Sequence, residues 1–173
     1  MTDRLKVRKA ADQDLPILVD FILRMIKLNA EFDPLLSVEE ESEGEVLSFV
    51  KEGLRDPKAL FLVAELGGSV AGVLRAGMVD RRFYAPRTVG QIDNIYVMPE
   101  FRRKEVGSVL LARADEELRK RGAQMILVEF PVQNYIASSF YTKEGFRPLM
   151  GVHARETDMR RTSAVRLLLA SDL

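Results

Sequence analysis

The fold follows from one stretch of the sequence, Val97-Met98-Pro99-Glu100-Phe101-Arg102-Arg103-Lys104-Glu105-Val106-Gly107-Ser108. An apolar run, 89–98, ends in it, and apolar residues at helical spacing, 106–118, follow it. A strand therefore leads through consecutive cations, 102–104, into the start of a helix. Backbone N–H groups at a helix start are unpaired and the helix dipole favours an anion there, so the sequence predicts a phosphate-binding turn. Gly107 would let a pyrophosphate approach the first helical turn.

Outward from this turn, hydrophobic patterns predict a single series of strands and helices. The expected strands are 5–8, 60–66, 70–79, 89–98, 125–132, 146–152 and 164–170, and the expected helices are 15–26, 46–54, 106–118 and 134–145. The order is β-α-α-β-β-β-α-β-α-β-β, which predicts an α/β protein of the α+β type with mixed strand pairing. In the strand-helix-strand unit 89–132, the two strands should run parallel.

Composition excludes several classes of chemistry. The 173 residues fit one ordinary domain, and 26 basic against 26 acidic residues leave no net charge. Zero net charge argues against broad binding to nucleic acid, although a local basic patch stays open. The chain has no cysteine and a single histidine, His153, so thiolate catalysis is excluded and no metal site is expected. We see no signal peptide and no stretch of membrane-spanning length, and therefore expect a cytoplasmic protein.

A second informative run lies downstream, from Asn134 to Phe146. Taken alone, Asn134 caps a helix, Tyr141 belongs to the core and Gly145 ends the helix. Together with the phosphate turn, the run resembles the GCN5-related N-acetyltransferase (GNAT) family, and the resemblance covers nearly the whole chain. The matching positions are Val97, Pro99, Arg102, Gly107, Leu110 and Leu111 around the family's Arg/Gln-x-x-Gly-x-Gly/Ala pattern, and Asn134, Ala137, Tyr141, Gly145 and Phe146 in its N-x-x-A-x-x-x-Y-x-x-x-G-F pattern.

The resemblance implies both a fold and an activity. It implies a single N-acetyltransferase domain over residues 1–173, with a mixed, mostly antiparallel sheet of about seven strands and helices on both faces. It also implies transfer of an acetyl group from acetyl-CoA to a small-molecule or peptide amine, directly in a ternary complex because no cysteine can carry the acyl group. The protein would be a monomer or homodimer that binds neither nucleic acid nor membrane. The alternatives are an acyl-CoA-binding sensor without catalysis and a binder of nucleic acid or nucleotide phosphate.

The resemblance assigns binding residues as well. The residues that it places against acetyl-CoA are Ile95, Tyr96, Val97, Arg102, Arg103, Lys104, Glu105, Val106, Gly107, Ser108, Asn134, Ala137 and Tyr141. Backbone N–H groups around Ile95 to Val97 would stabilise the acetyl oxyanion. One position departs from the family pattern, because Glu105 stands where the family usually has its first glycine. Its carboxylate would either repel the pyrophosphate or cap the empty helix end.

Proton transfer needs an acid and a base. The resemblance implies Tyr141 as the acid for the departing thiolate, because an unperturbed phenol has a pKa of about 10, close to that of an alkyl thiol. Asp93 lies where many relatives carry a carboxylate on the fourth strand, and it is the first candidate for the base. Glu129, in the fifth expected strand, is the reserve candidate, and an ordinary ion pair is the alternative for each. The acidic run 39–45 fits either a cationic acceptor or a solvated helix face.

Overall fold

The computed structural model describes residues 4–39 and 42–155. The chain divides into two compact units, residues 1–140 and 141–173, and each is described by itself. The strands are β1 (Lys6–Lys9), β2 (Ala59–Leu66), β3 (Ser69–Asp80), β4 (Thr88–Val97) and β5 (Ile126–Val128). The helices are α1 (Leu15–Ala30), α2 (Ser42–Arg55), α3 (Val106–Lys120) and α4 (Tyr135–Lys143), with short 3-10 turns at Asp12–Asp14, Pro34–Leu36 and Pro99–Phe101. The four expected helices are confirmed.

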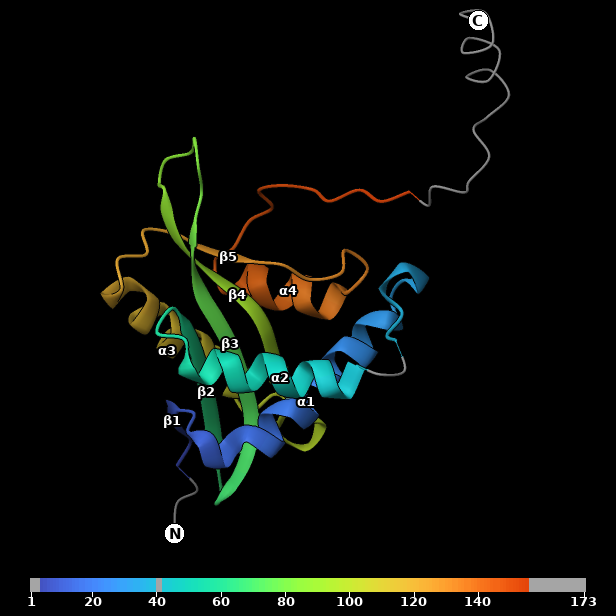
Figure 1. The fold of residues 1–173 in the computed structure, drawn as a ribbon, viewed down its shortest axis with the longest axis vertical. Helices are drawn as coiled ribbons and strands as arrows, with labels where there is room; N and C mark the ends of the chain where they lie inside the picture. Colours follow the sequence, from blue (N-terminus) through green and yellow to red (C-terminus); the bar gives the residue numbers. More distant parts are fainter. Residues whose placement is uncertain (1–3, 40–41, 156–173) are drawn as a thin grey trace, which may run out of the picture. The chain divides into compact units, whose positions relative to one another are not determined.

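One sheet forms the centre of the first unit. Its strands follow the order β1-β2-β3-β4-β5, so each strand lies beside its neighbour in sequence. The pairs β1–β2, β2–β3 and β3–β4 are antiparallel, whereas β4 and β5 are parallel and connected through α3. Figure 1 shows α1 and α2 on one face of this sheet and α3 on the other. The expected mixed, mostly antiparallel sheet with helices on both faces is therefore confirmed.

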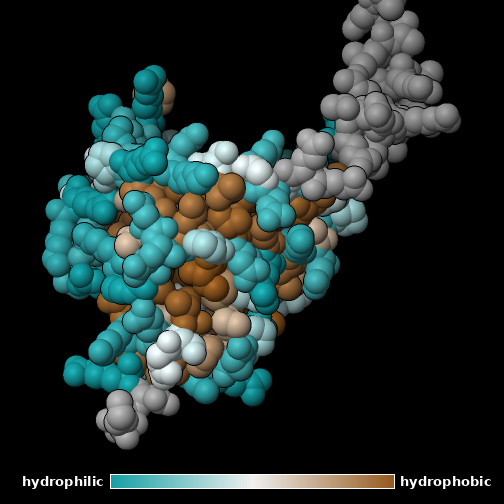
Figure 2. Space-filling view, turned by 60° about the horizontal axis from the view of Figure 1, so that its bottom comes forward, coloured by the Kyte–Doolittle hydropathy of each residue, from teal (hydrophilic) through white to brown (hydrophobic). Residues whose placement is uncertain are grey.

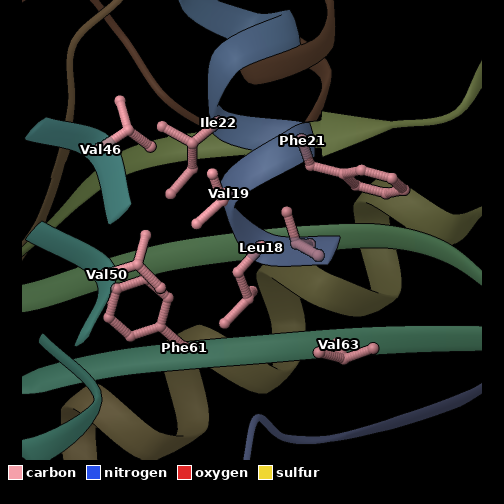
Figure 3. Packing of buried hydrophobic residues seen from close by; sticks show 9 residues of the cluster. Leu18, Val19, Phe21, Ile22, Val46, Val50, Phe61 and Val63 are labelled. Carbon is pink, nitrogen blue, oxygen red and sulfur yellow. The ribbon is translucent and has the colours of Figure 1, made fainter. Parts of the chain in front are cut away.

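Side-chain alternation along β2 separates two hydrophobic layers. Phe61 and Val63 point toward α1 and α2, where Figure 3 shows them packed with Leu18, Val19, Phe21 and Ile22 of α1 and Val46 and Val50 of α2. Leu60, Leu62 and Ala64 alternate with them and are also buried, so they face the α3 side. A strand buried on both faces needs apolar residues at every position, which explains the unbroken apolar run at 60–64.

β5 is shorter than the sequence predicts. The expected strand covers residues 125–132, but β5 ends at Val128. Glu129 and Phe130 are exposed, and Pro131 has no N–H group to donate to a neighbouring strand. The pairing between β4 and β5 stops at this point, and β4 continues paired with β3 only, among the described residues.

The number of strands is also lower than expected. Residues 146–152 form no strand, so the described part of the chain has a five-stranded sheet where about seven strands were expected. Pro148 interrupts this run, and Met150 and Val152 are 76% and 93% exposed. The last expected strand, 164–170, lies outside the described residues.

α2 carries charges that suit its direction. Glu43 and Glu45 lie in its first turn and Arg55 lies in its last turn. Negative charge at the start of a helix and positive charge at its end both interact favourably with the helix dipole.

Phe49, on the same helix, is 41% exposed. In Figure 2 hydrophobic residues, brown, fill the middle of the drawn face and hydrophilic residues, teal, surround them. Exposed apolar surface of this kind is typical of binding sites.

Candidate active site

The basic turn begins where β4 ends. The Arg102 Nε donates a hydrogen bond to the carbonyl of Val97 at 3.4 Å. The Lys104 Nζ lies 5.3 Å from the centre of the Phe101 ring, within cation–π distance. These contacts hold two of the expected phosphate-binding cations between the end of β4 and the start of α3. The third, Arg103, has a left-handed backbone with φ 63°.

The backbone conformation at Glu105 explains why the family pattern has glycine at this position. It is the N-cap residue of α3 and has a left-handed backbone, φ 61° and ψ 6°, which costs a residue with a Cβ about 1–2 kcal/mol. Glycine adopts this conformation without that cost. The Glu105 side chain makes no capping hydrogen bond, so only its charge can act on the helix end, and the choice between repelling the pyrophosphate and stabilising the empty helix end stays a prediction. Its carboxylate is exposed at the helix start, beside the expected phosphate site.

The structure gives a packing reason for glycine at position 107 that the sequence did not reveal. A Cβ at this position would lie 3.3 Å from Cζ and 3.4 Å from Cε2 of Phe140, which is closer than side chains normally approach. The space beside Gly107 is therefore filled by an aromatic ring, and this glycine lets α3 and Phe140 pack closely. Among the neighbouring binding residues predicted, Val106 is buried and Ser108 is half-buried.

β4 has an open edge beyond Ile92. The register with β5 ends at the pair Ile92–Val128, and β4 runs on through residues 93–97 with no partner strand on that side among the described residues. The backbone of an unpaired strand edge can bind an extended ligand by hydrogen bonds. This edge ends next to the basic turn.

The direction of the backbone groups at this edge follows from the β3–β4 ladder. The Met98 N–H donates to the carbonyl of Ala71 at 3.0 Å. Because pair types alternate in an antiparallel ladder, the N–H of Tyr96 also points toward β3, whereas the N–H groups of Ile95 and Val97 point to the open edge. Ile95 and Val97 thus offer backbone donors there, and Tyr96 does not.

A bulge in β4 places two polar side chains on the same face. Arg75 of β3 pairs with Asn94, whereas the next residue, Ala76, pairs with Ile92, so Asp93 is an extra residue in the ladder. The extra residue breaks the usual alternation of side chains. Asp93 and Asn94 consequently both line the pocket on the α1–α2 face of the sheet.

Asp93 is ion-paired and half-buried. Its carboxylate accepts a hydrogen bond from the Arg75 guanidinium, which lies 4.4 Å from the centre of the Phe49 ring. Burial raises the pKa of the Asp93 carboxyl above its usual range, and the Arg75 charge and a hydrogen bond with Gln91 oppose that rise. The charge of Glu129 raises the same pKa further. The structure thus brings both candidate bases into one electrostatic neighbourhood, with Asp93 in the pocket and Glu129 exposed.

A pocket of about 410 Å³ opens in front of Asp93, between α1, α2 and the β3–β4 pair. Its lining is apolar on the helices and charged or polar on the strands and at the start of α2. The apolar residues are Ile22, Ile26, Val46 and Phe49, and the polar ones are Glu45, Arg75, Asp93 and Asn94. Its volume lies within the range of small-molecule sites in proteins.

Sequence reasoning missed the part that Arg75 has in this site. Arg75 is the one charged residue in the apolar run 70–79, and that isolation was the available signal. A charged side chain inside a strand that is otherwise apolar needs a partner, because an unpaired buried charge is unfavourable. The partner, Asp93, lies on the next strand, and their pairing depends on the register and the bulge.

Asn134 begins α4. Its Oδ1 accepts a hydrogen bond from the N–H of Ala137 at 3.0 Å, the geometry of an N-cap. Asn134 and Ala137 therefore have a structural role at the helix start, and their expected contact with the pantetheine arm stays a prediction.

The second unit opens with the end of α4, and its hydrogen bonds explain the Y-x-x-x-G-F pattern. The N–H of Phe146 donates to the carbonyl of Tyr141 at 2.9 Å, and the N–H of Gly145 donates to that of Thr142 at 3.1 Å. Gly145 is left-handed, with φ 89°. Together these features make a Schellman motif, in which the residue after the glycine packs back on the helix. The rings of Tyr141 and Phe146 meet edge to face at 5.4 Å.

Tyr141 is 4% exposed. Burial raises the pKa of its phenol well above the usual value, so the hydroxyl is protonated at neutral pH. A protonated phenol is the form that a general acid requires, but the raised pKa also makes it a weaker acid than the ordinary phenol on which the match with an alkyl thiol was based.

Two kinds of site are absent from the described residues. No group of three or more histidine, cysteine, aspartate or glutamate side chains in residues 4–39 and 42–155 could hold a metal ion. Over the same ranges, no helix combines the length and apolar character needed to cross a membrane.

Solved structures with a similar fold include acetyltransferases. An aminoglycoside N-acetyltransferase in complex with CoA aligns with a TM-score of 0.76 at 15% identity, over 91% of this chain and 97% of that one. A predicted acetyltransferase from Clostridium acetobutylicum, solved with acetyl-CoA, aligns with a TM-score of 0.74 at 17% identity, over 88% of this chain and 96% of that one. At these identities the likeness establishes the fold.

Sequence relatives and a family profile establish the family as well as the fold. The chain is 32% identical over 94 residues, 54% of its length, to the aminoalkylphosphonate N-acetyltransferase of Salmonella typhimurium strain LT2. It is 33% identical over 101 residues, 58% of its length, to a putative [ribosomal protein bS18]-alanine N-acetyltransferase of Bacillus subtilis strain 168. The matches span 60% and 62% of these relatives' own lengths. The profile of the acetyltransferase (GNAT) family matches residues 23–146, and the chain belongs to this family.

Proposed function

We propose that this protein is an N-acetyltransferase that transfers an acetyl group from acetyl-CoA to a primary amine by direct attack in a ternary complex. One arrangement carries the proposal. The open edge of β4 ends at the basic turn, and the bulge of the same strand turns Asp93 into a pocket on its α1–α2 face. A donor bound along the edge and an acceptor in the pocket would therefore meet at β4.

The residues present fit acetyl-CoA. Arg102, Arg103 and Lys104 offer positive charge to a pyrophosphate at the start of α3, where the helix dipole adds to it. The N–H groups of Ile95 and Val97 offer donors for a developing negative charge on the acetyl oxygen. Acetyl-CoA supplies the activated acyl group, and the chain supplies its orientation.

Two side chains are proposed to move protons. Asp93 accepts the proton that a protonated amine must lose before it attacks, and its raised pKa makes it a better base than an exposed aspartate. The protonated phenol of Tyr141 donates to the departing thiolate. Glu129 is the alternative base.

A sensor that binds acyl-CoA without turnover is the second candidate. Glu105 favours it, because a carboxylate with a strained backbone stands where the phosphate turn of an acetyltransferase has glycine.

Thermal unfolding with and without acetyl-CoA, followed by thiol release with a panel of amines, separates these functions. An enzyme shows both a raised Tm and amine-dependent thiol release, whereas a sensor shows only the raised Tm. Absence of a Tm shift would refute both. Arg102→Gln should reduce the shift, and Arg119→Gln at the other end of α3 is the matched control because it removes the same charge far from the turn.

A further inference from the structure

The pocket on the α1–α2 face identifies a class of acceptor. We infer that the acceptor is a monoamine with a compact apolar body, whose ammonium group lies between Glu45 and Asp93 and whose hydrocarbon part lies against Ile26 and Phe49. This inference rests on the proposed acetyl transfer and names its acceptor.

The helical wall of the pocket is apolar. Ile22 and Val46 are 5% and 8% exposed and belong to the core cluster, so their positions are fixed by packing. Ile26 packs against that cluster, and Phe49 is held by the guanidinium of Arg75 at 4.4 Å. A hydrocarbon body removes this wall from water, whereas a polyhydroxylated body would find no hydrogen-bond partners on it.

The charges of the pocket favour one ammonium group. Its lining contains two carboxylates, Glu45 and Asp93, and one guanidinium, Arg75. Arg75 is paired with Asp93, so the described residues of the lining carry one net negative charge, and Glu45 is the carboxylate that is not paired with Arg75. One positive charge on the ligand neutralises this net negative charge, whereas several positive charges would leave an excess of positive charge in the pocket.

Arg75 is poorly placed to bind an anionic group of the acceptor. One of its nitrogens, Nη1, pairs with Asp93, and its Cζ lies 4.4 Å from the centre of the Phe49 ring. Its Nε has almost no accessible surface and no hydrogen-bond partner in the described residues, so this donor does not face the open pocket. An amine that also carries a phosphonate would place its negative charge near Glu45 without a matching donor from Nε. The inferred acceptor therefore differs from the aminoalkylphosphonates and aminoglycosides named for the similar proteins.

Four probes test the inference on the full chain: 2-phenylethylamine, 2-phenylethanol, 2-aminoethylphosphonate and kanamycin. Calorimetry measures the binding of each probe to the protein with CoA and alone, and thiol release measures kcat/KM with acetyl-CoA. We expect kcat/KM for 2-phenylethylamine to exceed that for the phosphonate and for kanamycin by about tenfold or more. 2-Phenylethanol, which has the same body without the charge, should bind at least about fivefold more weakly.

A preference for the phosphonate or kanamycin, or equal rates for the three amines, would overturn the inference and leave the acetyl transfer established. If acetyl-CoA gives neither a Tm shift nor thiol release, the proposed function fails instead. Calorimetry on the protein alone then still tests the pocket, and failure of 2-phenylethylamine to bind there sinks the inference.

A pair of variants locates the ammonium. Glu45→Gln removes the pocket carboxylate and should weaken 2-phenylethylamine binding about fivefold. Glu43→Gln changes the same residue type in the same helical turn but outside the pocket lining, and should leave binding unchanged. Equal effects of the two substitutions would contradict the placement of the ammonium beside Glu45.

Discussion

Arg75 and Asp93 form an ion pair between adjacent strands at the position where the β3–β4 register shifts. Without the bulge, Asp93 would alternate to a different face from Asn94, and the carboxylate would not line the same pocket. The pair also sets the protonation of Asp93, because the guanidinium opposes the effect of burial. A backbone irregularity thus controls both the direction and the acidity of the proposed base.

Arg75→Met should move the acidic limb of the kcat/KM profile to higher pH. The substitution removes the cation that lowers the Asp93 pKa, while burial and the Glu129 charge still raise it. A higher pKa means that the carboxylate, the form that accepts a proton, becomes abundant only at higher pH. The measurement is thiol release against pH. Arg75→Lys keeps the charge and should stay close to the wild-type profile, and an unmoved limb in a folded Arg75→Met protein would exclude Asp93 as the titrating base.

Glu105→Gly should stabilise the protein and tighten CoA binding. Glycine removes the cost of a left-handed residue, so the free energy of unfolding should rise by about 1 kcal/mol. Glu105→Ala removes the charge but keeps the Cβ, and therefore separates the two effects. If the carboxylate repels the pyrophosphate, both variants bind CoA more tightly in calorimetry, and only the glycine variant gains stability. Weaker binding in both variants would show that Glu105 contributes favourably.

Gly107→Ala should destabilise the fold, because the added Cβ meets Phe140. The helix propensity of alanine offsets part of this effect, because Gly107 lies in α3, so we expect a net loss of about 1 kcal/mol in denaturant unfolding and a larger loss for Gly107→Leu. Phe140→Leu in the same chain should recover part of the loss. Gly44→Ala on α2 is the control, since a Cβ there has no neighbour within 4 Å, and its stability should stay the same or rise. Equal effects at the two glycines would contradict the packing argument.

Tyr141→Phe should lower kcat by roughly 10²–10³-fold and leave KM for acetyl-CoA nearly constant, because the hydroxyl acts mainly in the transition state. The ring and its contact with Phe146 remain, so stability should change by no more than about 1 kcal/mol. Tyr135→Phe is the matched control on the same helix, where the side chain is 76% exposed, and it should change neither quantity. Wild-type kcat in Tyr141→Phe would leave Tyr141 with a structural role only.

The sequence was sufficient for the features that depend on near neighbours in the chain. Hydrophobic spacing located the four helices and the first four strands, because the period of a helix or strand is a local property. The Arg102–Ser108 turn and the helix from Asn134 to Gly145 were recognisable for the same reason, and capping bonds explain the residues of the second. The strand expected at 146–152 failed, since an apolar run becomes a strand only with a partner to pair with.

The site itself was decided by tertiary structure. Gly107 and Phe140 are far apart in the chain but pack against each other, and no local sequence pattern predicts this contact. The bulge at Asp93 and the ion pair with Arg75 depend on how two strands align, and the pocket depends on where α1 and α2 cover the sheet. A strand's register is fixed by the burial of whole faces and by its neighbours, not by its own sequence, which is why the residue types of the proposed base could be read in advance and its surroundings could not.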